Sequence, residues 1–152
     1  MQTFVPFKCY AKSAKALDRA RLGKQRVECI QILNCLSPEY DKKGWKNHPA
    51  VKMWKGYEGA LAQYGLACVK EWVSRGYKDF KCGPKLRAYA DSYKDDTPPK
   101  WFGDDRVHLS HRSNLLRKDP EYYGPLFPDV PNDLPYYWPT VSEIEQEVVT
   151  DE

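Results

Sequence analysis

The sequence predicts an all-α fold, a compact single-domain helical bundle wrapped by a C-terminal segment rich in proline and aromatic residues. Three observations favour this fold. Apolar residues recur at helical spacing in two long stretches, the alternation typical of β-strands is almost absent, and 152 residues suit a single domain. A chain of this length buries roughly 70% of its unfolded surface, which is enough for a hydrophobic core. We expect residues 1–140 to form the domain and residues 141–152 an acidic tail.

The first predicted helix spans about residues 13–36. Ser13 is a suitable N-cap, and Pro38 follows the end of the helix. At about 100° per residue, its apolar face is formed by Leu22, Cys29, Leu33 and Leu36. Arg21, Lys24, Glu28 and Gln31 form a polar stripe on a different face of the same helix. Arg26 falls at the apolar edge, so we expect it to be partly buried and to need an acceptor.

The second predicted helix spans about residues 49–75, with Pro49 in its first turn and Gly76 as its C-terminal stop. Its core face is formed by Trp54, Leu61, Cys68 and Trp72. Gly56, Gly59 and Gly65 each lower the helix propensity by about 1 kcal/mol relative to alanine. Close helix packing or a close backbone approach must therefore compensate at these glycines.

Two shorter helices should follow, one starting at Pro84 and one over about residues 105–117, with a loop between them. The segment after Lys118 holds six of the 12 prolines, so it is ordered only if it wraps the bundle. We expect its aromatic residues Tyr136, Tyr137 and Trp138 to pack against the helices. Capping-box spacings within residues 140–145 allow a short acidic helix or a frayed tail.

Composition excludes several classes of protein. The mean hydropathy is −0.75, and no apolar run approaches the roughly 20 residues that span a bilayer. The N-terminus MQTFVPFKCY lacks the apolar core of a signal peptide, so we expect a cytoplasmic protein with no membrane partner. Five cysteines without a CxxC pair argue against a disulfide framework and a zinc ribbon, and we expect them to be reduced.

Charge is distributed unevenly along the chain. The first 118 residues hold all 24 Lys and Arg but only 12 of the 21 Asp and Glu, a net charge of +12. Such a basic segment suggests a polyanionic partner, most often nucleic acid. The alternative is a well-solvated surface with no such partner.

Glu28 is the strongest candidate for a catalytic residue. It stands among Arg21, Lys24 and Arg26, whose charges hold a carboxylate ionised, and it could stabilise positive charge on a sugar whose glycosidic bond breaks. The alternative is a Lys24–Glu28 pair at i, i+4, worth only about 0.3 kcal/mol. Glu58 is a rival carboxylate in apolar surroundings, where we expect a structural pairing with Arg26 or another cation.

The three histidines, His48, His108 and His111, could in principle ligate zinc. No HExxH motif or Cys/His spacing accompanies them, so we expect no metal site and no cofactor. Instead they should face DNA or bind core groups, with His48 following Asn47. The segment HRSNLLRKDPEYY combines phosphate donors and stacking rings, namely Arg112, Asn114, Arg117, Lys118, Tyr122 and Tyr123. Packing is the alternative for both tyrosines.

Four blocks of the sequence resemble the family of pyrimidine-dimer DNA glycosylases. They are LDRARLGKQRVE, GWKNHPAVKMWKG, EWVSRGYKD and HLSHRSNLLRKDPEYYG, which together span most of residues 1–124. The similarity is greatest to a subgroup of bacterial and phage proteins. The resemblance implies a compact, metal-free helical bundle acting on double-stranded DNA, with no further subunit expected. It also implies a nucleoid-associated enzyme, or a phage-encoded one in the host cytoplasm.

The resemblance also implies roles for individual residues. In this family the N-terminal α-amine attacks the anomeric carbon to form a Schiff base, and a glutamate on the first helix assists. These positions correspond to Met1, retained because Gln2 is bulky, and Glu28. Val27 stands where the family has an arginine, and Arg26 is its possible replacement. The expected DNA contacts are Arg19, Arg21, Lys24, Arg26, Asn47, His48, His108, His111, Arg112, Asn114, Arg117, Lys118 and Tyr123.

Three functions remain open at this point. The first is a DNA glycosylase for a damaged or modified pyrimidine, with or without the lyase activity that cleaves the strand. The second is a DNA-binding module without chemistry. The third is an enzyme that acts on the hypermodified bases of a phage.

Overall fold

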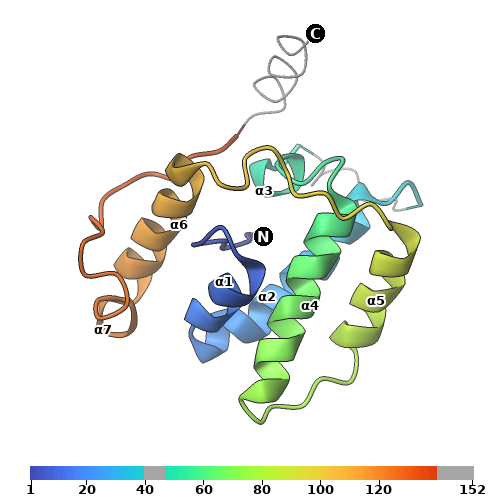
Figure 1. Ribbon diagram of the computed structural model, residues 1–152, viewed down its shortest axis with the longest axis horizontal. Helices are drawn as coiled ribbons and strands as arrows, with labels where there is room; N and C mark the ends of the chain where they lie inside the picture. The colour runs from blue at the N-terminus through green and yellow to red at the C-terminus, as the bar shows by residue number, and fades with distance from the viewer. Residues whose placement is uncertain (40–46, 140–152) are drawn as a thin grey trace, which may run out of the picture.

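The computed structural model describes residues 1–39 and 47–139, and these form helices and no strand. The all-α prediction is therefore confirmed (Figure 1). The helices are α1 (Tyr10–Ala16), α2 (Arg19–Leu36), α3 (Pro49–Lys52), α4 (Glu58–Ser74), α5 (Cys82–Ser92), α6 (Asp105–Lys118) and α7 (Pro120–Tyr123). The predicted capping boxes and the acidic tail lie outside the described residues.

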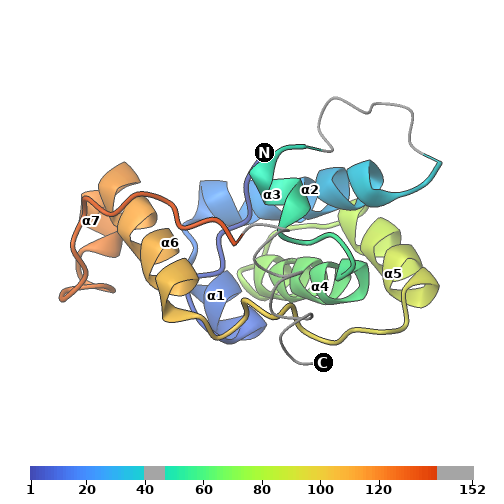
Figure 2. The same ribbon diagram turned by 90° about the horizontal axis from the view of Figure 1, so that it is seen from above.

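The centre of the bundle is the packing of α2 against α4. α1 and α5 pack against α4, and α6 and α7 lie at the other end of the molecule from α5 (Figures 1 and 2). α2 lies behind α1 and α4 in the view of Figure 1, as the turned view of Figure 2 shows. The first residues of the chain run through the middle of this arrangement, between α6 and α2.

The first predicted helix is in fact two, α1 and α2. Leu17 is extended, with φ −74° and ψ 140°, and Asp18 caps α2 by accepting a hydrogen bond from the Arg21 N–H. The expected N-cap, Ser13, lies inside α1, and Cys9 occupies the cap instead. Two extended residues, Leu17 and Asp18, therefore separate the two helices.

The second predicted helix is also divided, into α3 and α4. Pro49 opens α3 as expected, but Gly56 has φ +85°, a left-handed conformation that ends this helical run. Gly76 likewise follows α4 with φ +91°. At Gly59 an added Cβ would lie 2.2 Å from the Asp95 carbonyl oxygen, so this glycine allows the close backbone approach that the sequence predicts.

The core contains the predicted apolar faces. Leu22, Cys29 and Leu33 of α2 are fully buried, and so are Leu61 and Cys68 of α4. All five cysteines are free thiols, as expected from their spacing. Within the described residues, no helix combines the length and apolar character needed to cross a lipid bilayer.

The C-terminal segment after α7 returns along α6, as predicted (Figure 1). The Ser113 hydroxyl accepts from the Leu134 N–H at 3.1 Å, and the Ser110 hydroxyl accepts from the Tyr137 N–H at 3.1 Å. The aromatic side chains of this segment pack against the core; they are Tyr136, Tyr137 and Trp138. This wrap brings residue 136 back to the N-terminus of the chain.

Candidate active site

A pocket of about 370 Å³ opens where the N-terminal segment meets α2 and the C-terminal wrap. Both predicted catalytic residues, Met1 and Glu28, line this pocket. Three predicted DNA contacts, Arg21, Lys24 and Lys118, line it as well. The remaining lining residues are Gln2, Phe4, Ala20, Gln25 and Tyr136. Residues far apart in the sequence thus combine an amine, a carboxylate and three cations in one open cavity.

The Glu28 side chain is largely buried, with 7% of the residue exposed. One carboxylate oxygen accepts from the Gln2 N–H at 3.2 Å, and the other lies 3.5 Å from the Lys24 ammonium. The simple i, i+4 ion pair therefore exists, but it does not account for the whole environment of Glu28. The carboxylate also holds the backbone next to Met1, at the floor of the pocket.

Gln25 is a functional neighbour that the sequence reasoning missed. Its side-chain oxygen accepts from the Phe4 N–H at 2.8 Å, and its NH₂ group donates to the Gln2 carbonyl at 3.1 Å. Because Gln25 precedes Glu28 by three residues, both project from the same face of α2. The spacing QxxE in the sequence could therefore have indicated that Gln25 lies next to Glu28. These two side chains together hold the first four residues against α2.

Helix α4 and the turn before it hold the same segment from the other side. The Trp54 indole N–H donates to the Thr3 hydroxyl at 2.9 Å, and the Tyr64 hydroxyl donates to the Phe4 carbonyl. Thr3, Trp54 and Tyr64 are fully buried. The N-terminal segment is thus an inserted part of the core rather than a free end.

His108 and His111 hold Val5 between them. The Val5 N–H donates to Nδ1 of His111 at 2.9 Å, while Nδ1 of His108 lies 2.7 Å from the Val5 carbonyl oxygen. Nε2 of His108 accepts from the Gly103 N–H at 2.8 Å, so His108 carries its proton on Nδ1. Because Nδ1 of His111 accepts from the Val5 N–H, His111 carries its proton on Nε2. The sequence predicted that these histidines either face DNA or bind core groups. In the structure both rings are buried and bind core groups.

Arg112 completes the anchoring of the segment. Its guanidinium donates to the Pro6 carbonyl at 2.6 Å and lies 5.4 Å from the centre of the Phe7 ring. Burial lowers the pKa of Arg112. Side chains of α2, α4 and α6 bind the backbone of Gln2, Phe4, Val5 and Pro6. At Thr3 the side chain is bound instead, by Trp54. This preorganised strap fixes Met1 at the pocket.

We expect acid to destabilise the protein through His111. Burial and, to a smaller extent, the neighbouring His108 lower the pKa of His111 from 6.5 to about 3. The unfolded chain therefore binds a proton below pH ~6.5 that the folded chain does not, and the free energy of unfolding falls by up to about 1.4 kcal/mol per pH unit. Urea denaturation between pH 7 and pH 4.5 measures this slope.

His111→Asn is the matched variant for this prediction. Its side-chain oxygen can still accept from the Val5 N–H, but it has no titrating ring. The pH slope of the variant should be shallower than that of the natural protein by about one proton. Equal slopes would show that His111 does not carry the acid sensitivity.

Arg26 finds its acceptor in Asp79, which the sequence did not single out. The guanidinium donates to the Asp79 carboxylate and stacks 4.2 Å from the centre of the Trp72 ring. Of the partners expected for Glu58, which were Arg26 or another cation, Arg26 is therefore excluded. Glu58 is half-buried and accepts from the Gly56 N–H at 3.3 Å, because it begins α4 immediately after the turn.

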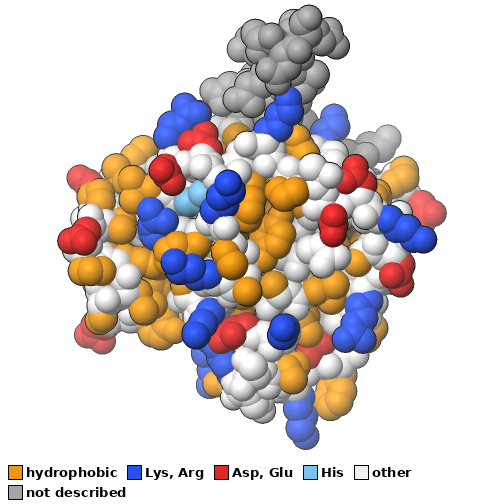
Figure 3. Space-filling view, in the orientation of Figure 1, with side chains coloured by type: hydrophobic (Ala, Val, Ile, Leu, Met, Phe, Trp, Pro, Cys, Tyr) orange, Lys and Arg blue, Asp and Glu red, His pale blue; other side chains and the backbone are white. Residues whose placement is uncertain are grey.

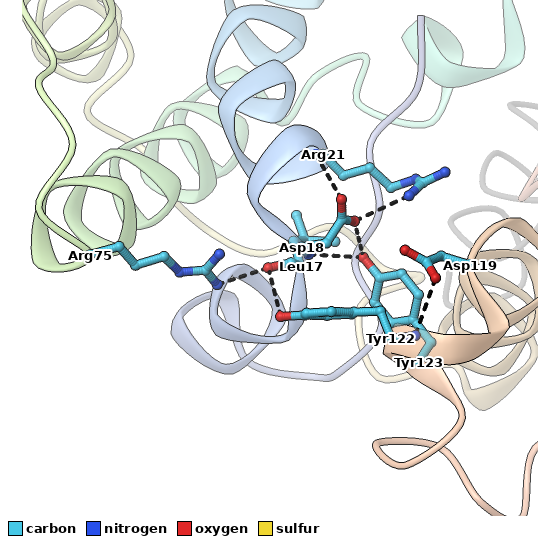
Figure 4. Close-up of polar contacts among 7 residues, drawn as sticks. All are labelled: Leu17, Asp18, Arg21, Arg75, Asp119, Tyr122 and Tyr123. Atoms are coloured by element: carbon cyan, nitrogen blue, oxygen red, sulfur yellow. Dashed lines mark hydrogen bonds and ion pairs between the residues drawn. The ribbon is translucent and has the colours of Figure 1, made fainter.

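Tyr123 is buried and binds the break between α1 and α2 (Figure 4). Its hydroxyl donates to the Asp18 carboxylate and accepts from the Asp18 N–H at 2.9 Å. Burial and the hydrogen bond to the Asp18 carboxylate raise the pKa of Tyr123. Burial acts to raise the pKa of Asp18, but hydrogen bonds from Tyr123 and Arg21 outweigh it and lower that pKa. Packing, the alternative noted from the sequence, therefore describes Tyr123.

The same break is held from α4. Arg75 donates to the Leu17 carbonyl at 2.8 Å, and the Tyr122 hydroxyl lies 3.5 Å from that oxygen (Figure 4). The bond from Arg75 satisfies a carbonyl left without a helical partner where α1 ends. These contacts fix the angle at which α2, with Glu28, enters the site.

The other predicted DNA contacts divide into surface and supporting positions. Arg19, Lys24, Asn47 and Lys118 are exposed. Arg117 is exposed as well, but its guanidinium donates to the Asn132 carbonyl at 2.7 Å, to the Leu134 carbonyl at 3.3 Å and to the Asn114 side chain, so it supports the wrap. Asn114 is buried and donates to the Ser110 carbonyl at 2.8 Å and to the Leu134 carbonyl at 3.2 Å, so it supports the wrap instead.

His48 immediately precedes α3. Its ring nitrogen Nδ1 accepts from the Ala50 N–H at 3.1 Å, which makes it the N-cap of α3. Partial burial lowers the pKa of His48, and the positive charge of the Met1 amine lowers it further.

A second groove of about 660 Å³ lies along α2 next to the first pocket. It shares Ala20 and Lys24 with that pocket, and its other lining residues are Asp18, Arg19, Gly23, Trp72 and Tyr122. Two aromatic rings and two cations therefore follow the exposed side of α2, which extends the basic surface beyond the pocket.

The opposite face of the molecule has a different character. In Figure 3, which shows the side away from α2, lysine and arginine side chains are spread around a band of hydrophobic side chains, with acidic side chains among them.

Among residues 1–39 and 47–139, no cluster of three His, Cys, Asp or Glu side chains could hold a metal ion.

Comparison with known proteins assigns the family. Residues 1–81 match the family model described as pyrimidine dimer DNA glycosylase. Comparison with curated proteins and with solved structures found no match. The matched part contains the inserted N-terminal segment and helices α1 to α4, and therefore both Met1 and Glu28. Because the match covers 81 of the 152 residues, the chain belongs to the pyrimidine dimer DNA glycosylase family.

Proposed function

We propose that this protein is a DNA glycosylase that releases a damaged or modified pyrimidine from double-stranded DNA. The observation that carries the proposal is the shared pocket of Met1 and Glu28, in a chain of this family. The amine is a nucleophile, the carboxylate is an electrostatic partner, and the surrounding cations suit phosphates. Neither group alone would single out this chemistry.

The reaction begins with the α-amine of Met1. Its nitrogen lone pair forms a bond to C1′ of the sugar, and the glycosidic bond breaks with its electron pair leaving on the base, which takes up a proton. The attacking amine must be neutral, because its lone pair forms the new bond. Opening of the sugar ring and loss of an amine proton leave a Schiff base between the nitrogen and C1′.

Glu28 acts while the glycosidic bond breaks. Positive charge develops on the sugar at this stage, and an ionised carboxylate at the pocket floor stabilises it more than it stabilises the neutral ground state. The hydrogen bond from the Gln2 N–H keeps the carboxylate oriented without neutralising it. Differential stabilisation of this kind accelerates the chemical step rather than binding.

Strand cleavage can follow from the same intermediate. The Schiff base makes the proton at C2′ acidic, and its removal expels the 3′ phosphate with the C3′–O bond electrons. The lyase step therefore needs no metal ligand and no second nucleophile, only a base that accepts the C2′ proton.

Trapping with borohydride tests the proposal. Borohydride adds hydride to the Schiff base and makes the link permanent, so the protein should form a covalent complex with ultraviolet-irradiated or abasic duplex DNA. Hypermodified duplexes in parallel reactions identify the base that is released. An N-terminal extension that is retained should abolish trapping, because it removes the amine from the pocket, while the thermal unfolding temperature shows whether the fold survives.

The outcomes separate the three functions. Base release with trapping on irradiated DNA supports the repair enzyme, and release only from hypermodified DNA supports the phage-base enzyme. Salt-sensitive duplex binding without release or trapping on any substrate would leave a DNA-binding module and contradict the proposal.

A further inference from the structure

We propose that Phe80 is a wedge that inserts into the base stack of the duplex whose nucleotide is held at the pocket, several base pairs from that nucleotide. This inference rests on the proposed function. Phe80 lies between α4 and α5 and is 79% exposed, more than any other exposed large hydrophobic residue of the described chain. A single exposed apolar side chain is ordinary by itself. The backbone beneath Phe80 and the charges around it distinguish this residue.

The backbone on both sides of Phe80 is anchored. The Asp79 carboxylate accepts from the Arg26 guanidinium of α2 and from the Gly83 N–H of α5, the latter at 2.8 Å. The Trp72 indole of α4 donates to the Lys78 carbonyl at 3.0 Å. Three helices therefore fix the loop, and Phe80 is presented to solvent on a rigid support. Insertion of a preorganised ring orders little further backbone.

Phe80 lies on the far flank of α2 from Glu28. The exposed ridge of α2 passes through Lys24 and Val27, with Glu28 on one side of Val27 and Arg26 on the other. Arg26 contacts Asp79, the neighbour of Phe80. Since a helix is about 10–12 Å across, the ring and the pocket are separated by at least the width of α2, or roughly three base-pair steps of 3.4 Å. One duplex can reach both.

The surroundings of Phe80 are cationic. Lys78 and Lys81 are exposed within two residues of it in the sequence, Lys85 is exposed in the first turn of α5, and the charge of Asp79 is paired with Arg26. Apolar side chains flanked by cations are used to unstack base steps, at a cost of about a few kcal/mol per step that phosphate contacts offset. A protein partner would meet three lysines around one ring, so duplex DNA fits this surface better.

The test compares natural protein, Phe80→Ala and Phe80→Trp on duplexes with a non-cleavable tetrahydrofuran abasic site. 2-Aminopurine placed at successive positions on both strands fluoresces more strongly when it is unstacked. We expect the natural protein and Phe80→Trp to raise the fluorescence at one step several base pairs from the abasic site. Phe80→Ala should lose that signal and bind about tenfold more weakly. Leu126→Ala, a half-exposed apolar residue just after α7, is the matched control and should behave as the natural protein.

A second measurement separates this proposal from the proposed function. Phe80→Ala should be trapped on single-stranded abasic DNA as readily as the natural protein, because no stack has to be opened, but at least about tenfold more slowly on duplex substrate. If no protein is trapped on any DNA, the proposed chemistry fails while the fluorescence still tests the wedge. Unchanged fluorescence on binding of the natural protein, or an unchanged signal in Phe80→Ala, would overturn the wedge.

Discussion

Glu28→Gln should slow base release by a factor of about 10² or more while DNA affinity stays equal or rises. Glutamine keeps the shape of the side chain, and its amide oxygen can still accept from the Gln2 N–H. The variant therefore removes the charge that stabilises the sugar in the transition state, together with the repulsion of phosphates. Single-turnover base release and duplex affinity, measured on one substrate, test both parts.

Glu58→Gln is the matched control for this prediction. Glu58 is the rival carboxylate, but it is half-buried at the start of α4 and does not line the pocket. We expect its replacement to leave the rate of base release unchanged. Full excision by Glu28→Gln together with its loss in a folded Glu58→Gln protein would show that the wrong carboxylate has been assigned.

Asp79→Asn should destabilise the protein by about 3 kcal/mol. The Asp79 side chain is only 3% exposed and Arg26 is 13% exposed, so the substitution leaves a buried guanidinium without its counter-charge. Urea denaturation measures the loss. The exposed Asp95, which accepts from the Thr97 hydroxyl at 2.6 Å, provides a matched control, and Asp95→Asn should not change stability measurably.

A double variant distinguishes the ion pair from general damage to the loop. Arg26→Met keeps much of the alkyl chain against Trp72 and removes the charge, so the combination with Asp79→Asn should be more stable than the sum of the two single losses predicts. Strict additivity would mean that the two side chains do not act as a pair.

Local sequence signals predicted the helices but not their breaks. The apolar positions of α2 and α4 are correct, because a buried stripe repeats every 3.6 residues whatever the tertiary contacts. The break at Leu17 escaped this reasoning, although Asp18 is a good N-cap. What holds the break is Tyr123, whose hydroxyl binds Asp18 across 105 positions of the chain. Spacing along one helix cannot reveal such a partner.

The sequence by itself determined the helical content, the basic character of the first 118 residues and the position of Glu28 among cations on one helix. These properties depend on neighbours within a few turns. Only the tertiary structure decided that the first seven residues enter the core, that His108 and His111 bind Val5 rather than DNA, and that Asp79 pairs with Arg26. Each of these depends on which buried polar groups meet, because a buried donor must find an acceptor wherever the fold places one. The meeting of Met1 and Glu28 in one pocket is the functional result of those long-range bonds.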